Sequence, residues 1–287
     1  ELAELDRLDA TGGQTPNVAL RMNPGVAAHT HPGIRTGARE DKFGLPPEQI
    51  RGILARAANF PHLQLRGLHL HIGSQIPGPE PTLAALEVAL GVLADFPALD
   101  TLDIGGGFPV PYTPADDFPT IEAFAAPIVE RLLRVPGLTV FLEPGRLLTA
   151  DAGALVLSVQ AVKTTGAIRT VIADGGMNAL LRPALYGAVH PVLPLVAALP
   201  PVVSAPFDLA GPICESSDFL ARHISLPADI QRGDRVAILL AGAYGMAMAS
   251  NYNSQPLPAE VLVESRSHRL IRRRQRLADL VEAEENL

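Results

Sequence analysis

The stretch Leu102-Asp-Ile-Gly-Gly-Gly-Phe-Pro109 is the most informative segment of this chain. An apolar run that stops at three consecutive glycines is typical of a buried strand whose end brings backbone N–H groups close to another group. A bound phosphate is one such group, and a plain tight turn is the alternative. The segments on either side of this stretch favour the phosphate.

The first half of the chain alternates between strand and helix patterns. We expect strands over 17–22, 65–72, 99–104 and 138–142, and helices over 46–60, 81–96 and 121–135. Four βα units in series predict a parallel sheet. Polar residues gather at the carboxyl ends of these strands, where (β/α)8 barrels hold their active sites. They are Arg21, Asn23, His69, His71, Ser74, Asp103, Glu143 and Arg146.

Four strands make only half of such a barrel, and the outer two would be left as open edges. The chain also begins on Glu1, inside a helix pattern formed by Leu2, Leu5 and Leu8. We therefore expect that the natural protein has more chain before Glu1.

Beyond residue 150 the pattern changes to strands separated by proline and glycine. Strands are expected over 154–163, 170–174, 202–209, 235–240, 259–263 and 268–272, with a helix over 275–284. This predicts a second, mostly antiparallel β domain. The expected division is a half-barrel domain over 1–150 and a β-rich domain over 151–287.

Composition excludes several classes of protein. The chain has 287 residues, of which 47% are hydrophobic and 18% charged, and a formal charge of −7. It has no apolar run of membrane-spanning length, and its acidic balance argues against a nucleic-acid partner. The single cysteine, Cys214, fits a reducing compartment, so we expect a cytoplasmic protein.

Five motifs in order resemble those of diaminopimelate decarboxylases, a group of pyridoxal-phosphate enzymes with an alanine-racemase-like barrel. They are His69-Leu-His-Ile-Gly-Ser-Gln75, Gly105-Gly-Gly-Phe-Pro109, Glu143-Pro-Gly-Arg146, Cys214-Glu-Ser-Ser-Asp218 and Gly242-Ala-Tyr244. The resemblance implies a (β/α)8 barrel followed by a β domain. It further implies a homodimer in which two subunits share each active site, with no metal.

The resemblance assigns roles to the barrel residues. His71 would stack on the pyridoxal ring, although a hydrogen-bonded core histidine is the alternative. Glu143 would keep the ring nitrogen protonated, and a salt bridge to Arg146 is the alternative. His69 faces the same side as His71 by strand alternation and receives less weight. The phosphate would be held by Ser74, Gly105, Gly106, Gly107, Gly145 and Arg146.

The β domain supplies the remaining candidates. The resemblance makes Cys214 the proton donor to the carbanion left after decarboxylation, whereas a buried hydrophobic cysteine is the alternative. Glu215 would recognise the far amino group of the substrate, and Ser216 to Asp218 could be only a turn or cap. Candidates for the substrate carboxylates are Arg146, Arg182 and Tyr186, because arginine presents a planar fork to a carboxylate. Tyr244 would close over the phosphate, or be only a core aromatic.

One expected residue is missing. Enzymes of this kind hold the cofactor as a Schiff base to a lysine, but the chain has only Lys42 and Lys163, and neither lies in the expected motif. We therefore expect negligible activity from the 287 residues alone. For the intact protein the resemblance implies decarboxylation of meso-2,6-diaminopimelate to L-lysine, the last step of lysine biosynthesis. The alternatives are a decarboxylase of ornithine, arginine or carboxynorspermidine, and a non-catalytic relative.

Overall fold

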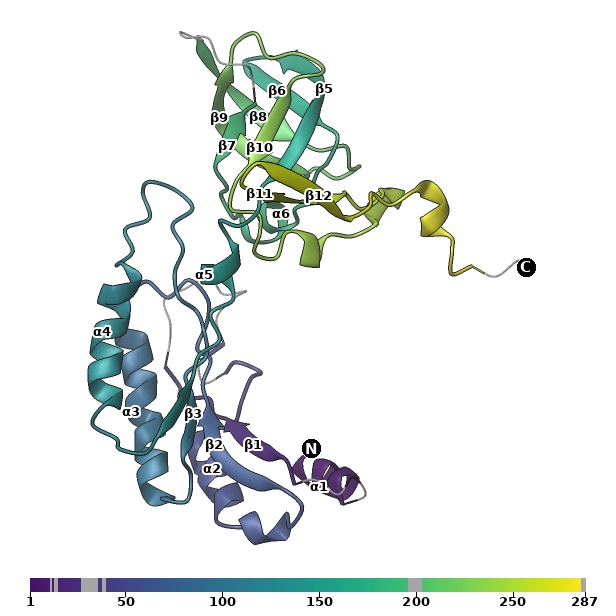
Figure 1. Ribbon diagram of the computed structural model, residues 1–287. Coiled ribbons are helices and arrows are strands. Elements are labelled where there is room, and N and C mark those ends of the chain that lie inside the picture. The colour runs from purple at the N-terminus through teal and green to yellow at the C-terminus, as the bar shows by residue number, and fades with distance from the viewer. Residues whose placement is uncertain (11, 13–14, 27–35, 38–39, 196–202, 285–287) are drawn as a thin grey trace. The chain divides into compact units, whose positions relative to one another are not determined.

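The computed structural model describes residues 1–10, 12, 15–26, 36–37, 40–195 and 203–284. The chain forms two compact units (Figure 1). Unit 1 comprises Glu1–Pro111 and Asp116–Leu147, and unit 2 comprises Tyr112–Ala115 and Leu148–Leu287. The expected boundary at residue 150 remains a prediction. The segment Tyr112–Ala115 precedes that boundary in the sequence but belongs to unit 2.

Unit 1 is built on a parallel sheet with the strand order β1-β2-β3-β4. Its strands are β1 (Asn17–Arg21), β2 (Gln64–His69), β3 (Thr101–Asp103) and β4 (Thr139–Phe141). The register aligns Arg21 with His69, His69 with Asp103, and Asp103 with Phe141. The carboxyl ends of all four strands therefore form one row, and the half barrel expected from the sequence is confirmed.

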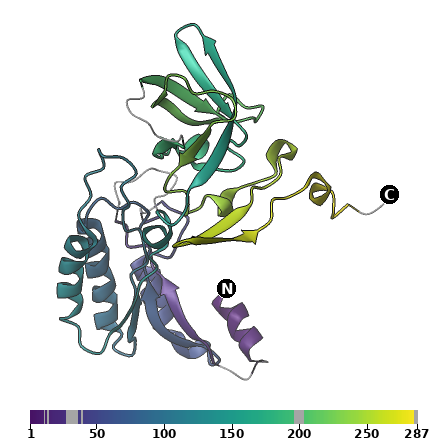
Figure 2. The same cartoon turned by 45° about the horizontal axis from the view of Figure 1, so that its top comes forward.

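Most helices of unit 1 follow a strand and cover the sheet, whereas the first helix precedes β1 (Figures 1 and 2). The elements are α1 (Leu2–Asp9), α2 (Pro47–Leu54), the 3-10 turn η2 (Ala57–Asn59), α3 (Glu80–Asp95), α4 (Ile121–Leu132) and α5 (Arg146–Thr149). The apolar faces of α2, α3 and α4 meet the sheet in one core. Its fully buried members include Ile50, Leu68, Leu86, Leu102 and Phe124.

Several elements end earlier than the sequence pattern predicts. Helix α2 stops at Leu54, because the next residues wind into η2. Strand β2 stops at His69. The backbone carbonyls of His71 and Ile72 instead accept hydrogen bonds from Thr36. Its Oγ1 donates to the His71 carbonyl at 2.7 Å, and its N–H donates to the Ile72 carbonyl at 3.2 Å. His71 therefore lies in a loop and does not end a strand.

Unit 2 contains a six-stranded sheet in the order β7-β10-β5-β6-β8-β9. The strands are β5 (Leu155–Thr165), β6 (Ile168–Ala173), β7 (Val192–Pro194), β8 (Ser204–Ala210), β9 (Phe219–Pro227) and β10 (Arg235–Ile238). Strands β6 and β8 are parallel, and the other neighbours are antiparallel. The mostly antiparallel domain is confirmed, while β7 and β9 were not predicted. Residue 202 of the expected strand 202–209 lies outside the described residues.

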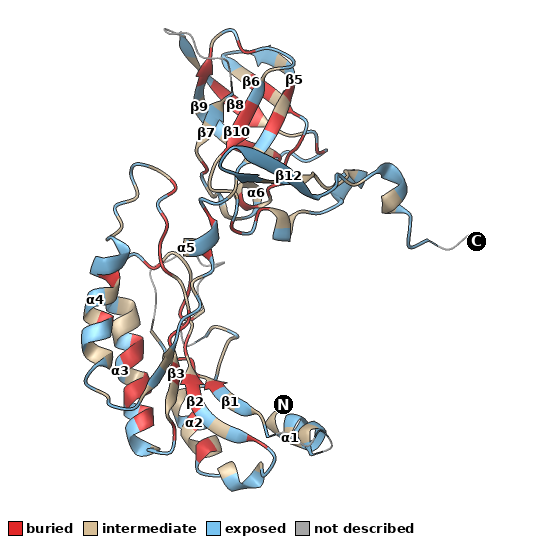
Figure 3. Ribbon diagram, viewed as in Figure 1, coloured by how far each residue is buried: buried red, intermediate tan, exposed pale blue. Residues whose placement is uncertain are grey.

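A hairpin and several short helical turns complete unit 2. The hairpin pairs β11 (Glu260–Glu264) with β12 (Ser267–Arg272), and β12 is exposed throughout (Figure 3). The turns are α6 (Arg182–Tyr186), η3 (Met246–Met248), η4 (Tyr252–Ser254) and η5 (Leu277–Leu280). The helix expected over 275–284 is wrong, because Gln275 is instead hydrogen-bonded to Leu257 and only η5 follows.

Among the described residues, no helix is both long and apolar enough to cross a membrane.

Candidate active site

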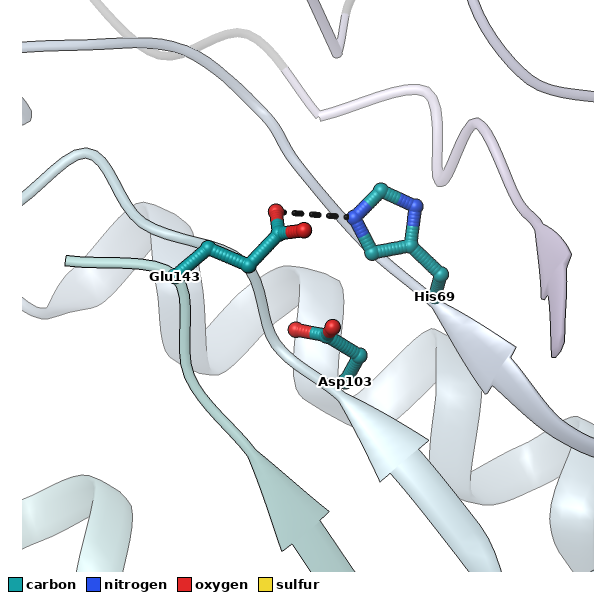
Figure 4. Close-up of side chains that lie close together, drawn as sticks. All are labelled: His69, Asp103 and Glu143. Carbon is teal, nitrogen blue, oxygen red and sulfur yellow. Dashed lines mark hydrogen bonds and ion pairs between the residues drawn. The ribbon is translucent and has the colours of Figure 1, made fainter. Parts of the chain in front are cut away.

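Three polar side chains meet where β2, β3 and β4 end. His69 ends β2, Asp103 ends β3, and Glu143 follows β4 (Figure 4). His69 Nε2 lies 3.1 Å from Glu143 Oε2. Each of the three residues also offers one atom that could bind a metal ion, and these three atoms lie within 4.8 Å of one another. The Glu143 side chain is 52% exposed, so its carboxylate is accessible to a ligand. Such donors also suit a divalent cation, but the neighbouring residues point to a different ligand.

His71 and Asp103 hold the glycine turn in place. The Gly105 N–H donates to Asp103 Oδ1 at 2.8 Å, and the Gly106 N–H donates to His71 Nδ1 at 3.3 Å. Burial lowers the pKa of His71, and the positive charge of Arg21 lowers it further. The ring is therefore neutral at pH 7, with its proton on Nε2, because Nδ1 is the acceptor.

The glycine triplet packs directly against the neighbouring loops. A Cβ on Gly106 would lie 2.2 Å from the Glu143 carbonyl oxygen. Gly107 has φ +95°, and its Cβ would lie 2.3 Å from the Gly73 carbonyl oxygen. Crowding of the backbone alone therefore requires glycine at both positions, and the phosphate role of the triplet remains a prediction. The same contacts bring His71, Gly106 and the Glu143 backbone close together, and their roles toward a cofactor remain predictions.

The turn at Gly145 is open. A Cβ placed on Gly145 would meet nothing within 4 Å, in contrast to the glycine triplet. Arg146, the first residue of α5, is buried. The Glu143 carboxylate is hydrogen-bonded to His69, the histidine that received less weight in the sequence. Ser74 is half-buried beside Gly73.

Gln75 is a structural residue of unit 1 that the sequence did not reveal. Its side-chain amide donates to the Val110 carbonyl at 2.9 Å and accepts from the Val110 N–H at 2.8 Å. These two bonds tie the His71 loop to the segment after the glycine triplet. A side chain that both donates to and accepts from the backbone of one distant residue leaves no periodic pattern in the sequence, so this role could not be predicted.

In unit 2, Cys214 is exposed, so the alternative of a buried hydrophobic cysteine is wrong. The Cys214 N–H donates to Asn253 Oδ1 at 3.1 Å. Beside it, the Tyr252 hydroxyl donates to the Glu215 carboxylate, and this bond raises the pKa of Tyr252. Tyr252 and Asn253 thus hold the Cys214–Glu215 pair, a role that the sequence did not assign.

Asp218 is more than a turn residue. It is 3% exposed, and its carboxylate accepts from the Met177 N–H at 2.6 Å and from the Ile213 N–H at 2.7 Å. A Cβ on Gly176 or Gly211 would lie 2.3 or 2.4 Å from its oxygens. Asp218 therefore joins the loop before Cys214 to the loop that leads into α6.

The last candidates lie at short turns of unit 2. Arg182 begins α6 and is buried, with its guanidinium carbon 4.8 Å from the centre of the Tyr112 ring. Tyr186 ends α6 and is half-buried. Tyr244 is 42% exposed and has φ +67°, so it is a surface side chain and not a core aromatic.

Comparison with known proteins places this geometry in a class. Residues 1–150 match the family described as "Pyridoxal-dependent decarboxylase, pyridoxal binding domain". That range contains the sheet, His71, the glycine triplet and Glu143, so fold and site define a pyridoxal-dependent decarboxylase, and the expected pyridoxal phosphate cofactor is confirmed.

Relatives narrow the class further. The chain is 39% identical over 285 residues to the diaminopimelate decarboxylase of Haemophilus influenzae, which covers 98% of this chain and 68% of that protein. The crystal structure of diaminopimelate decarboxylase from Helicobacter pylori complexed with L-lysine gives a TM-score of 0.89 at 35% identity, covering 98% of this chain and 70% of the other. The chain belongs to the diaminopimelate decarboxylase family.

Proposed function

We propose that the complete gene product decarboxylates meso-2,6-diaminopimelate to L-lysine and CO2, with pyridoxal phosphate as cofactor. Membership of the family supports the reaction. The observation that carries it in the structure is the contact of His71 and Glu143 with the same glycine, Gly106. In this proposal His71 would face the ring, the Glu143 carboxylate would face the ring nitrogen, and Gly106 would face the phosphate of one cofactor.

The described residues fit this cofactor. Glu143 has an accessible carboxylate, His71 has a neutral ring, and the turn at Gly145 leaves open space. When bound, pyridoxal phosphate supplies an electron sink for the pair of electrons released as CO2 leaves. Residues for its phosphate are Ser74, Gly105, Gly106, Gly107, Gly145, Arg146 and Tyr244.

The chain's own residues would bind and orient the substrate and move one proton. With the cofactor bound, Glu143 would keep a proton on the ring nitrogen, its own carboxylate being oriented by His69. The exposed Cys214 thiol delivers a proton to the carbon that has lost CO2. Glu215 binds the distal ammonium group. Arg146, Arg182 and Tyr186 bind the carboxylates, because a guanidinium pairs with a carboxylate through two parallel hydrogen bonds.

Neither lysine of the chain fills the role of the cofactor-binding amine in this proposal. Lys163 lies in β5, paired with Thr170 of β6. The Lys42 ammonium lies 5.2 Å from the centre of the Phe43 ring. The chain covers 68% of the Haemophilus influenzae relative, and the proposal requires a lysine in a Tyr-Ala-x-Lys segment that these 287 residues do not contain. Sequencing the DNA before the Glu1 codon tests this point.

The activity itself is tested by CO2 release from purified complete gene product. We expect release from meso-2,6-diaminopimelate, with L-lysine formed in equal amount. Ornithine, arginine and carboxynorspermidine serve as competing substrates, and a higher kcat/KM with any of them would overturn the proposed substrate. The 287-residue chain is the control, and measurable release from it would contradict the requirement for a further lysine.

We also propose a cytoplasmic homodimer whose subunits share each active site. The exposed Cys214–Glu215 pair of unit 2 is the segment that would enter the partner's site. Mixing a Cys214→Ala subunit with a Glu143→Ala subunit tests the sharing, since only mixed dimers would restore one intact site. Absence of any restored activity in the mixture, with dimers verified by light scattering, would contradict it.

A further inference from the structure

Tyr112, Arg182 and His190 form a buried cluster in unit 2. Their exposed fractions are 7%, 6% and 2%. The His190 and Tyr112 rings pack in a T-shaped arrangement, with centroids 5.0 Å apart and an interplanar angle of 81°. The Arg182 guanidinium lies over the same Tyr112 ring, with its carbon 4.8 Å from the centroid. The tyrosine thus supports both the cation and the imidazole.

The hydrogen bonds of His190 fix its tautomer. Nδ1 lies 3.0 Å from the Leu239 carbonyl oxygen, which can only accept, so Nδ1 carries the proton. Nε2 lies 2.8 Å from Nη1 of Arg182, which can only donate, so Nε2 is the acceptor. A neutral ring protonated on Nδ1 is therefore the one form that satisfies both contacts.

The sheet holds His190 in this position. Strands β7 and β10 are antiparallel, with Val192 opposite Ile238. The pairing continues one step beyond the strands, where the Leu239 N–H donates to the Pro191 carbonyl at 2.9 Å. Leu239, whose carbonyl orients the imidazole, is thus held next to His190 by the pairing that extends from β7 and β10.

A neutral acceptor has a specific consequence for Arg182. A carboxylate at the position of Nε2 would orient the guanidinium but would also cancel its charge. The neutral imidazole orients one N–H of the guanidinium and does not itself cancel the charge of Arg182. That charge is what an arginine needs if it is to bind a carboxylate of the substrate.

We infer that His190 is a positioning residue, which through its Nδ1–H tautomer directs the Arg182 guanidinium toward a substrate carboxylate. The inference rests on the proposed function, because Arg182 is assigned to the substrate there. It concerns a histidine outside the five motifs that define the site in the sequence.

Two substitutions separate the contacts of His190. His190→Gln places an amide oxygen near the position of Nε2, where it accepts from Arg182. His190→Asn places an amide N–H near the position of Nδ1, where it donates to Leu239 but does not reach Arg182. In the complete gene product we expect His190→Asn to raise the KM for meso-2,6-diaminopimelate about tenfold, as for loss of a hydrogen bond to a charged group. His190→Gln restores most of the affinity, and kcat changes less than KM in both.

Two measurements keep the inference falsifiable if a variant folds poorly. In the wild-type protein, 15N-correlated NMR of the imidazole should show a neutral ring protonated on Nδ1; protonation on Nε2 alone would overturn the inference. In an Arg182→Lys background, His190→Asn should give little further increase in KM, and a full additional tenfold increase would overturn it too. Wild-type protein that binds cofactor but releases no CO2 would refute the proposed function, while the NMR result would still decide the tautomer.

Discussion

The His69 imidazole and the Glu143 carboxylate share a hydrogen bond of 3.1 Å between Nε2 and Oε2, although 74 residues separate them in the chain. His69 ends β2, and Glu143 follows β4, so the strand β3 lies between the two strands that carry them. The carboxylate assigned to the cofactor nitrogen is therefore oriented by a neighbouring strand end.

Removing His69 should weaken the action of Glu143. We expect His69→Ala to lower kcat about fivefold, which corresponds to about 1 kcal/mol for one lost hydrogen bond. His69→Gln is the matched control, because its amide N–H lies near the position of Nε2 and retains the donor. Steady-state kinetics and cofactor binding by fluorescence are the measurements. Equal activity of the alanine and glutamine variants would show that the bond has no role.

The stability of unit 1 should depend on the titration of His71. Burial, and then the charge of Arg21, lower its folded-state pKa below the ordinary value of 6.5. The unfolded chain therefore binds the proton more readily, and the stabilisation that is fully present above pH 6.5 is lost as pH falls through the folded-state pKa. Urea unfolding at several pH values measures this dependence.

His71→Asn is the control for that pH series. The asparagine oxygen accepts from the Gly106 N–H as Nδ1 does, but it does not titrate in this range. We expect a smaller loss of stability on acidification in this variant than in the wild type. Identical slopes in the two proteins would assign the acid sensitivity to other histidines.

Adding one methyl group to Gly106 should destabilise unit 1. The Cβ of Gly106→Ala would lie 2.2 Å from the Glu143 carbonyl, so one of the two loops must move. We expect a loss of about 1–3 kcal/mol, the range for overpacking in a tight site. Gly91→Ala, in the interior of α3 where a Cβ meets nothing within 4 Å, should instead stabilise by about 0.5–1 kcal/mol. Unfolding midpoints that move in the same direction would contradict this.

Neutralising Asp218 should loosen the loop that carries Cys214. The carboxylate accepts two backbone N–H groups on its two oxygens, whereas an asparagine turns one of these acceptors into a donor. We expect Asp218→Asn to cost about 1–3 kcal/mol, as for a buried unsatisfied group. Asp229→Asn, at an exposed position, should change stability by less than about 0.5 kcal/mol. Thermal unfolding and the rate of Cys214 alkylation are the measurements, and unchanged alkylation would contradict a role in holding the loop.

The sequence by itself determined the class of this protein and the order of its elements. Strands of the half barrel are apolar segments with local periodicity, and motifs such as Gly105 to Pro109 require only consecutive residues. The alternation of strand and helix then fixed the parallel sheet and placed His71, Asp103 and Glu143 at one edge. Local patterns failed at the expected helix over 275–284 and at β7 and β9, whose structure depends on pairing with distant segments.

Only the tertiary structure decided which side chains act together. The pairing of His69 with Glu143, the two-loop contact of Asp218 and the tautomer of His190 all join residues that are far apart in sequence. Each depends on one or two hydrogen bonds with defined direction and distance, and such bonds leave no periodic pattern in the chain. Strand register and loop packing set these distances, so they exist only once the sheets have formed.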